Sequence, residues 1–164
     1  MLINLEFKAS IFSLQGAKDR SINIGAVHLT TLHQIDTYFN TNTGRLKLRE
    51  INDSEAQLIY YEREENALDR WSNYGIYEVQ ALKPLKELLT KAIGVRVIVS
   101  KERDVYTYKN ARIHIDDVEK LGKFIEFEVI HESDTDKTTQ LLEFLITSFS
   151  PEIDKVFLQS YADL

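Results

Sequence analysis

Charged side chains recur at alternate positions in several segments of this 164-residue sequence. In an extended strand, alternate residues point to the same side of the backbone. Leu46 and Leu48 separate three cations in one such segment, and Ile113 and Ile115 occupy the apolar positions of another. The charged positions are Glu6 and Lys8; Arg45, Lys47 and Arg49; Lys101 and Arg103; Arg112, His114 and Asp116; and Glu126 and Glu128.

The two signs of charge on these faces suit different parts of one ligand. Lysine and arginine bind phosphate oxygens, and arginine can do so with two parallel hydrogen bonds. Paired carboxylates such as Glu126 and Glu128 bind hard divalent cations such as Mg²⁺ or Mn²⁺. Together, these residue types indicate a site for a metal-bound triphosphate.

Two architectures would explain strands with one charged and one apolar face. In an ordinary antiparallel sheet, the charged faces are simply solvated and the apolar faces are buried. In a closed barrel of about eight strands, the charged faces point inward and leave room for one small ligand. Only the barrel brings all of the charged positions into one interior.

Turn and capping signals predict an α+β chain in which antiparallel sheet dominates. The turn residues Asn42-Thr43-Gly44 join two strands into a hairpin, and Pro84 suits the first turn of a helix. The predicted strands cover residues 1–10, 35–39, 45–51, 56–64, 71–81, 95–108, 111–116 and 123–131. Helices are predicted for residues 13–27, 85–93, 135–149 and 151–161. No linker composition interrupts the chain, so we expect a single domain over residues 1–164.

The composition limits the classes of partner. A net charge of −6 argues against broad nucleic-acid binding, which normally requires a basic field. The sequence contains no cysteine, no basic and apolar leader, and no window near the ~20 apolar residues that a membrane span needs. We therefore expect a soluble cytoplasmic protein that binds neither nucleic acid nor membranes.

The order of the charged segments resembles the CYTH, or triphosphate tunnel, superfamily, which includes class IV adenylyl cyclases, thiamine triphosphatases and inorganic tripolyphosphatases. The family opens with an E-x-E-x-K strand, and residues 4–8 here read NLEFK, so Asn4 replaces the first acid. Residues 44–50, GRLKLRE, are similar to the family's basic strand, and residues 101–103, KER, match its K-x-R strand.

The later motifs extend this resemblance over nearly the whole chain. Asp116, followed by Glu126 and Glu128, is similar to the family's late acidic cluster. Residues 34–39, QIDTYF, and residues 160–164, SYADL, resemble the cyclase-like branch, as does the His114-to-Asp116 segment. The resemblance implies a closed eight-stranded antiparallel barrel with charged faces inward and helices packed outside.

The resemblance also implies a role for each charged position. Glu6, Glu126 and Glu128 are expected to bind the metal, with Asp116 nearby as a ligand or a supporting group. The residues expected to bind the phosphate chain are Lys8, Arg49, Lys101 and Arg103, with Arg45, Lys47 and Arg112 as further cations and Arg63 in place of a family lysine. The expected catalytic set is Glu6, Lys8, Arg49, Lys101, Arg103, Asp116 and Glu126. The loss of an acid at Asn4 leaves the number of bound metal ions open.

The leading functional prediction is a Mg²⁺- or Mn²⁺-dependent enzyme that acts on a triphosphate. The cyclase-like motifs favour an adenylyl cyclase, which converts ATP to cyclic AMP and pyrophosphate. The alternatives are a triphosphatase acting on tripolyphosphate, thiamine triphosphate or nucleotides, and a binder of triphosphates without catalytic activity. No residue pattern decides among them.

Three further expectations concern residues without an assigned role. His114 is interpreted either as a proton carrier or as a structural hydrogen-bonding group. Asp36 is interpreted as a structural acid near the barrel or at a subunit contact. Related cyclases indicate a homodimer, to which the aromatic and acidic run from Asp36 to Phe39 would contribute.

Overall fold

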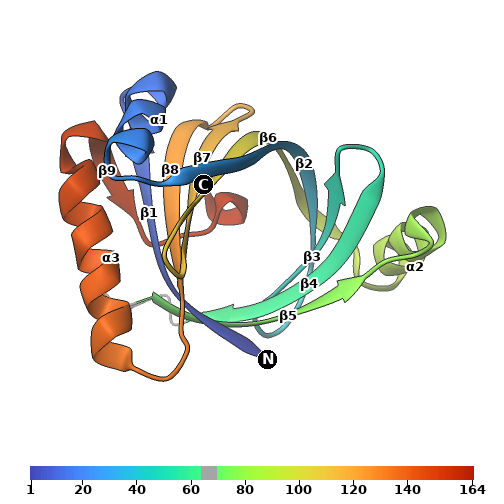
Figure 1. Cartoon of the computed structure of the whole chain (residues 1–164). Coiled ribbons are helices and arrows are strands. Elements are labelled where there is room, and N and C mark those ends of the chain that lie inside the picture. Colours follow the sequence, from blue (N-terminus) through green and yellow to red (C-terminus); the bar gives the residue numbers. More distant parts are fainter. Residues whose placement is uncertain (64–69) are drawn as a thin grey trace.

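The strands of the chain form a closed antiparallel barrel (Figure 1). The computed structural model describes residues 1–63 and 70–164. Within these residues, the sheet order is β5-β4-β3-β2-β6-β7-β8-β1-β9, and pairing of β1 with β5 closes a ring of eight strands. The barrel strands are β1 (Leu2–Ile11), β2 (Val27–Phe39), β3 (Arg45–Ile51), β4 (Glu55–Arg63), β5 (Arg70–Glu78), β6 (Val95–Tyr108), β7 (Ala111–Val118) and β8 (Gly122–Ile130). The predicted closed barrel is confirmed.

Among the described residues, three α-helices lie outside the barrel, near the first three predicted positions (Figure 1). They are α1 (Leu14–Asn23), α2 (Leu82–Ile93) and α3 (Thr135–Phe149). The side chain of Ser13 caps α1 by accepting a hydrogen bond from the Gly16 amide, and Asp134 caps α3 in the same way. Helices α1 and α3 pack against β1, β7 and β8, whereas α2 lies against β2.

The main hydrophobic core lies between these helices and the outer face of the barrel. Phe127 from β8 and Phe149 from α3 are fully buried in it, together with Ile113 from β7. Full burial of one such side chain is worth about 1.5–3 kcal/mol. Because alternate residues face opposite sides, the strands that supply this outer core also carry charged side chains inward.

The chain enters β2 earlier than the sequence pattern predicts. Helix α1 ends at Asn23 rather than near residue 27, and Gly25 follows with a φ of 89°, in the left-handed region that suits glycine. Strand β2 then begins at Val27 rather than near residue 35 and pairs with β6 along its whole length.

No helix in the described part of the chain has the length and apolar character needed to cross a membrane.

The predicted helix over residues 151–161 is wrong. A short 3₁₀ turn, η1 (Ser150–Glu152), leads instead into strand β9 (Ile153–Phe157), and a second turn, η2 (Tyr161–Asp163), follows. Strand β5 covers one edge of β1 only as far as Glu6, and β9 pairs with the same edge from Lys8 onward. The extended conformation therefore satisfies backbone groups of β1 that a helix would leave open.

Candidate functional site

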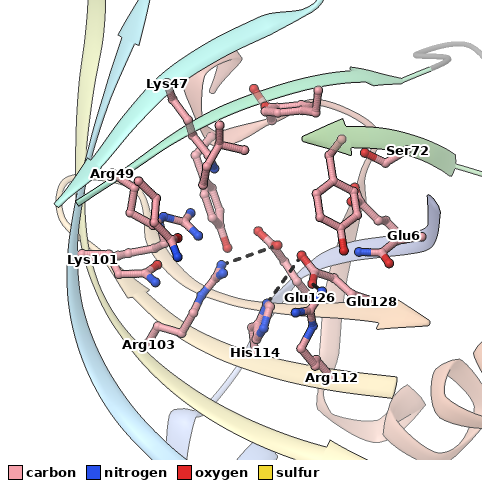
Figure 2. Close-up of a pocket in the computed structure, with 18 of the residues that line it drawn as sticks. Glu6, Lys47, Arg49, Ser72, Lys101, Arg103, Arg112, His114, Glu126 and Glu128 are labelled. Atoms are coloured by element: carbon pink, nitrogen blue, oxygen red, sulfur yellow. Dashed lines mark ion pairs between the residues drawn. The ribbon is translucent and has the colours of Figure 1, made fainter. Parts of the chain in front are cut away.

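The barrel encloses a cavity of about 350 Å³, within the size range of small-molecule sites. Most of the predicted site residues line it, and they point toward one another from strands on all sides (Figure 2). The predicted residues on its wall are Glu6, Lys8, Lys47, Arg49, Arg63, Lys101, Arg103, Arg112, Glu126 and Glu128. The described wall does not include Asp116 or Arg45, which lie elsewhere.

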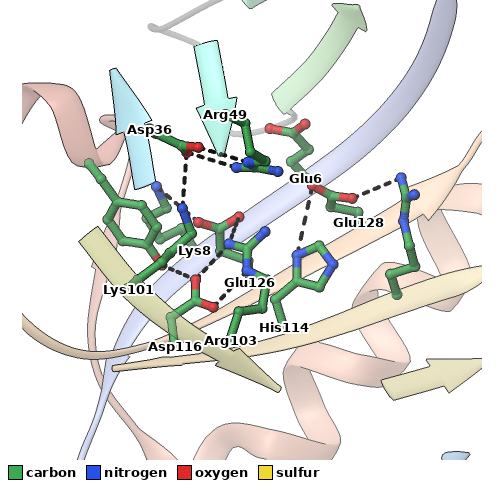
Figure 3. Close-up of polar contacts among 12 residues, drawn as sticks. Glu6, Lys8, Asp36, Arg49, Lys101, Arg103, His114, Asp116, Glu126 and Glu128 are labelled. Carbon is green, nitrogen blue, oxygen red and sulfur yellow. Dashed lines mark hydrogen bonds and ion pairs between the residues drawn. The ribbon is translucent and has the colours of Figure 1, made fainter. Parts of the chain in front are cut away.

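A basic cluster surrounds Asp36 on one wall of the cavity (Figure 3). Arg49 donates two hydrogen bonds to this carboxylate, at 2.7 and 2.8 Å. Lys101 and Lys47 lie 3.0 and 3.2 Å from its Oδ2 atom. Burial alone would raise the pKa of Asp36, but the three cations hold that pKa well below its usual value. Three cations around one carboxylate leave surplus positive charge toward the cavity.

The two lysines of the basic cluster titrate in an unusual range. Burial, followed by the charge of Arg49, lowers the pKa of Lys47 to about 7. Burial also lowers the pKa of Lys101 to about 8, although Asp36 opposes the shift. Near neutral pH, the charge on this wall can therefore respond to an incoming anion.

Arg103 is held from behind by Asp116. The guanidinium donates hydrogen bonds of 2.7 and 2.6 Å to the two oxygens of Asp116, and the Tyr161 hydroxyl donates a third bond of 2.6 Å to the same carboxylate. Asp116 is fully buried, and Arg103 lowers its pKa despite the opposing effect of burial. The structure thus places Asp116 as a support for the cation, behind the cavity wall, apart from the other predicted metal-binding acids.

An acidic cluster of Glu6, Glu126 and Glu128 forms the opposite wall (Figure 3). Glu6 and Glu128 are direct partners across the β1–β8 ladder. Each acid contacts at least one cation: Glu6 lies 3.0 Å from Arg63, Glu126 lies 3.2 Å from Lys8, and Glu128 lies 2.9 Å from Arg112. Burial and the neighbouring carboxylates raise the pKa of Glu6 despite Arg63. The site is therefore partly neutralised without a metal ion.

His114 lies beside the acidic cluster. The residue is only 6% exposed, and burial, together with the charge of Arg103, lowers its pKa to about 4. A ring nitrogen of His114 and one oxygen each of Glu126 and Glu128 lie within 4.8 Å of one another. This donor set fits a divalent cation, and two buried atoms on the cavity wall, His114 Nδ1 and Asn4 Oδ1, have no hydrogen-bond partner among the described residues.

The two ends of the tunnel differ. At one end, the Lys8 ammonium lies 3.6 Å from the centre of the Tyr161 ring, and Tyr161 packs with Tyr38. Arg45 is placed at this end, where it pairs with Asp163 at 3.1 Å and lines a small outer pocket. The segment around η2 therefore covers this end of the barrel.

The other end of the tunnel is more apolar. On β2, Leu32 lies toward the end of the strand opposite Tyr38. Leu32 lines the cavity together with Ile51, Ile59 and Val105. Thr30, which pairs with Val105, lines this end as well, so the cavity combines a charged middle with an uncharged, mainly aliphatic end.

Sequence reasoning missed some of the residues that organise this site. Asp36 is a structural acid of the barrel, as one of its two interpretations predicted, but its place at the centre of the basic cluster was not predicted. Arg70, which lies just outside the predicted strand of residues 71–81, begins β5 and lies 4.0 Å from Glu6. Tyr161 was predicted to end a helix and belonged to a segment that resembles the cyclase-like branch, but it was given no role in the site.

The run from Asp36 to Phe39 cannot form the predicted subunit contact, because all four residues are buried within this chain. Asp36 and Tyr38 face the interior side of β2, so they are inaccessible to a second copy. A homodimer remains a prediction that rests on the family resemblance alone.

The fold and the charged cavity define a class of closed antiparallel barrels with a charged interior. The chain belongs to the CYTH domain family, whose sequence model matches residues 2–156. No curated protein matches the sequence significantly. The family assignment therefore agrees with the predicted resemblance.

Solved structures with the same fold cover nearly all of the chain. The PH1012 protein from Pyrococcus horikoshii superposes with a TM-score of 0.86 at 22% identity, over 98% of each chain. A candidate adenylate cyclase from Vibrio parahaemolyticus gives 0.76 at 17% identity, over 99% of this chain and 97% of its own. HpAC1 from Hippeastrum, a candidate adenylyl cyclase described as having a dominant triphosphatase activity, gives 0.64 at 15% identity, over 92% and 90%. At these identities, the likeness establishes the fold.

Proposed function

We propose that the protein is a metal-dependent enzyme acting on an organic triphosphate. The observation that carries this proposal is the division of one closed cavity into a basic wall around Asp36 and an acidic wall of Glu6, Glu126 and Glu128. A triphosphate carries enough negative charge to engage the first wall, and a divalent cation engages the second. Membership of the CYTH family supports the same class of substrate.

The basic residues would bind and polarise the phosphate chain. Arg49 and Lys101 are fixed by Asp36, and Arg103 is fixed by Asp116, so their donors are oriented before a ligand arrives. Fixed donors stabilise charge that develops on departing phosphate oxygens without a reorganisation cost at that moment. Lys8 and Arg63 extend this positive lining toward β1 and β4.

The acidic residues would hold Mg²⁺ or Mn²⁺. Glu126 and Glu128 offer carboxylate oxygens within 4.8 Å of each other, and Glu6 is the cross-strand neighbour of Glu128. A bound divalent ion supplies neutralisation of phosphate charge and a lower pKa for an attacking hydroxyl group. The surrounding cations, including Arg112 on Glu128, balance these acids before substrate binds.

The uncharged, mainly aliphatic end of the tunnel favours a substrate with an organic group over a bare polyphosphate. Leu32, Ile51 and Val105 provide a surface that phosphates would not use. With ATP, the ribose 3′ hydroxyl would lose its proton to solvent and its oxygen would bond to the α-phosphorus, while the bond between the α-phosphorus and the bridging oxygen breaks and pyrophosphate leaves with that oxygen. Arg49, Lys101 and Arg103 would stabilise the pyrophosphate as it departs.

Hydrolysis is the second candidate reaction. The same tunnel could orient water against the terminal phosphorus, and the Hippeastrum protein of the same fold is described as having a dominant triphosphatase activity. The two reactions require the same phosphate-binding residues and differ in the attacking oxygen. Product identity therefore separates them.

The test is a product analysis of the purified protein with ATP, thiamine triphosphate or tripolyphosphate, in the presence of Mg²⁺ or Mn²⁺. Cyclic AMP with pyrophosphate supports the cyclase, and orthophosphate supports the hydrolase. Tight triphosphate binding without any product would contradict an enzymatic role, and neither binding nor turnover would reject the tunnel as a triphosphate site. The exposed substitution Lys91→Ala serves as a control for changes unrelated to the cavity.

A further inference from the structure

The His114 imidazole is an unexplained group on the cavity wall. The side chain is 7% exposed, and Nδ1 is buried without a hydrogen-bond partner among the described residues. A buried polar atom without a partner costs about 1–3 kcal/mol, so it calls for a physical reason. Its inward orientation on β7, between Arg112 and Asp116, aims the ring at the acidic cluster.

The separation between His114 and Glu128 fits two ligands of one ion. Nδ1 lies 3.9 Å from Oε1 of Glu128, which is too long for a hydrogen bond. In octahedral coordination, two ligand atoms that each lie ~2.1 Å from the metal are roughly 3.0 Å apart at adjacent positions and about 4.2 Å apart at opposite positions. Glu126 contributes the third donor, and the three ligand atoms lie within 4.8 Å of one another. A small contraction would bring them around one ion.

The neighbouring cations leave room for this arrangement. Arg112 binds Oε2 of Glu128, so the oxygen that faces His114 is the other one. Glu126 contacts Lys8 through Oε1, and its Oε2 lies 3.5 Å from Arg103, beyond the length of a strong charged hydrogen bond. Both carboxylates can therefore accept an ion without losing every existing partner.

We propose that His114 is a nitrogen ligand of the divalent ion held by Glu126 and Glu128. This inference rests on the proposed function of the tunnel and specifies its metal preference. An imidazole ligand favours first-row transition metals over Mg²⁺, which prefers oxygen ligands alone. The site should therefore select Mn²⁺ over Mg²⁺ and bind Co²⁺ more tightly than either. A neutral nitrogen donor also compensates for the acid that Asn4 replaces without adding negative charge.

Pulsed electron paramagnetic resonance of bound Mn²⁺ tests this ligand directly. The full chain is loaded with Mn²⁺ and a methylene-bridged tripolyphosphate analogue, which contains no nitrogen and resists hydrolysis. We expect a ¹⁴N coupling that becomes a ¹⁵N coupling after selective histidine labelling. Bound Mn²⁺ without a histidine coupling, or no bound Mn²⁺ at all, would overturn the proposal. The measurement on unsubstituted protein does not depend on whether a variant folds.

Metal titration of His114→Asn provides the second readout. Loss of the imidazole should weaken Co²⁺ binding by at least about tenfold, since even groups that only orient a ligand are worth roughly 10–100-fold. Mg²⁺ affinity should change little. The exposed substitution His33→Asn is the matched control and should leave both affinities and the ¹⁴N coupling unchanged. Equal loss for Co²⁺ and Mg²⁺ would contradict a specific nitrogen ligand.

Turnover distinguishes failure of this inference from failure of the proposed function. If the native protein converts a triphosphate with Mg²⁺ and bound Mn²⁺ shows no histidine coupling, the enzyme assignment stands and His114 is not a ligand. If no triphosphate is bound or converted, the function of the tunnel fails first.

Discussion

The two walls of the tunnel pair their buried charges with counter-ions in different ways. The basic cluster places one acid, Asp36, among Lys47, Arg49 and Lys101, so positive charge exceeds negative charge. The acidic cluster gives each of its three glutamates a cation drawn from a different strand. In the basic cluster, the single counter-ion lies at the centre. In the acidic cluster, the counter-ions surround the three acids. This difference suits an anion on one wall and a small cation on the other.

Burying the charges of either wall costs free energy, which the hydrophobic core outside the barrel must offset. Taking charges out of water costs several kcal/mol per ion unless pairing and hydrogen bonds offset it. The wall formed by β1, β7 and β8 is backed by α1 and α3, where Phe127, Ile113 and Phe149 are fully buried. Apolar burial outside the strands thus stabilises the charged faces inside them.

Removal of an acidic-wall ligand should have the largest effect. We expect Glu126→Gln to reduce kcat by at least ~10² because it removes charge from a preorganised catalytic site. Turnover measured across a Mn²⁺ titration checks this, with the exposed substitution Glu143→Gln as the matched control. Full activity of Glu126→Gln at ordinary metal concentrations would remove the metal role from this wall.

Loss of Arg103, a cation that lies between the two walls, should have the next largest effect on activity. Arg103→Ala removes a charged hydrogen bond worth ~1.5–3 kcal/mol, which corresponds to roughly ten- to more than hundred-fold in kcat/KM. The loss should be similar at all metal concentrations, because Arg103 is expected to act on phosphate. Kinetics at saturating Mn²⁺ measure this effect. A defect that excess metal repairs would instead assign Arg103 to the acidic wall.

Asp36→Asn should reveal the structural role of the basic wall. Breaking a buried ion pair typically costs about 3–5 kcal/mol, here through repulsion among Lys47, Arg49 and Lys101. Added tripolyphosphate should raise Tm more in this variant than in the native protein, because the anion replaces the missing counter-ion. Urea unfolding and thermal melts measure both effects, with the exposed Asp53→Asn as control. Unchanged stability would show that Asp36 does not hold the cluster together.

The pH dependence of stability provides a sign test for the same residue. The folded-state pKa of Asp36 is depressed, so its stabilising effect should be complete above the unfolded pKa of about 3.9. The effect is lost as pH falls through the lower folded pKa. The stability gap between the native protein and Asp36→Asn should therefore narrow in acid, as measured by urea unfolding at a series of pH values.

The smallest effect should come from titration of the basic wall. Lys47, with a pKa of about 7, and Lys101, with a pKa of about 8, are both charged in the empty tunnel below neutral pH. A bound triphosphate favours the charged forms, so affinity should fall as pH rises, by no more than about tenfold per pH unit for each lysine. Calorimetry in two buffers should detect proton uptake near pH 7.5.

Lys47→Arg isolates the protein's share of this pH dependence. Arginine stays charged throughout the range, so the lower step in affinity should disappear while titration of the ligand itself continues. An identical pH profile in Lys47→Arg would contradict the predicted titration of Lys47.

Strand alternation is a local property of the chain, so it could be read from the sequence, and together with the family resemblance it led to the predicted barrel. Charged and apolar residues alternate within the five residues from Arg45 to Arg49 and within the three from Glu126 to Glu128, so each segment reveals its two faces. Asp36 could not be assigned from its neighbours, since its partners Arg49 and Lys101 come from strands β3 and β6. Strand β9 was predicted as a helix because its conformation depends on the open edge of β1, which is distant in sequence.

The closed ring of strands has a consequence for how the chain folds. Strand β1 pairs with β8 along one edge and with β5 along the other, so residues near position 4 meet partners near positions 72 and 130. Contacts between residues so distant in sequence slow folding, because loop closure must precede the gain from pairing. Opening either seam would hydrate the interior and separate its two charged walls. We therefore expect affinity for triphosphate to appear only in the last kinetic phase of refolding, which makes ligand binding a probe of ring closure.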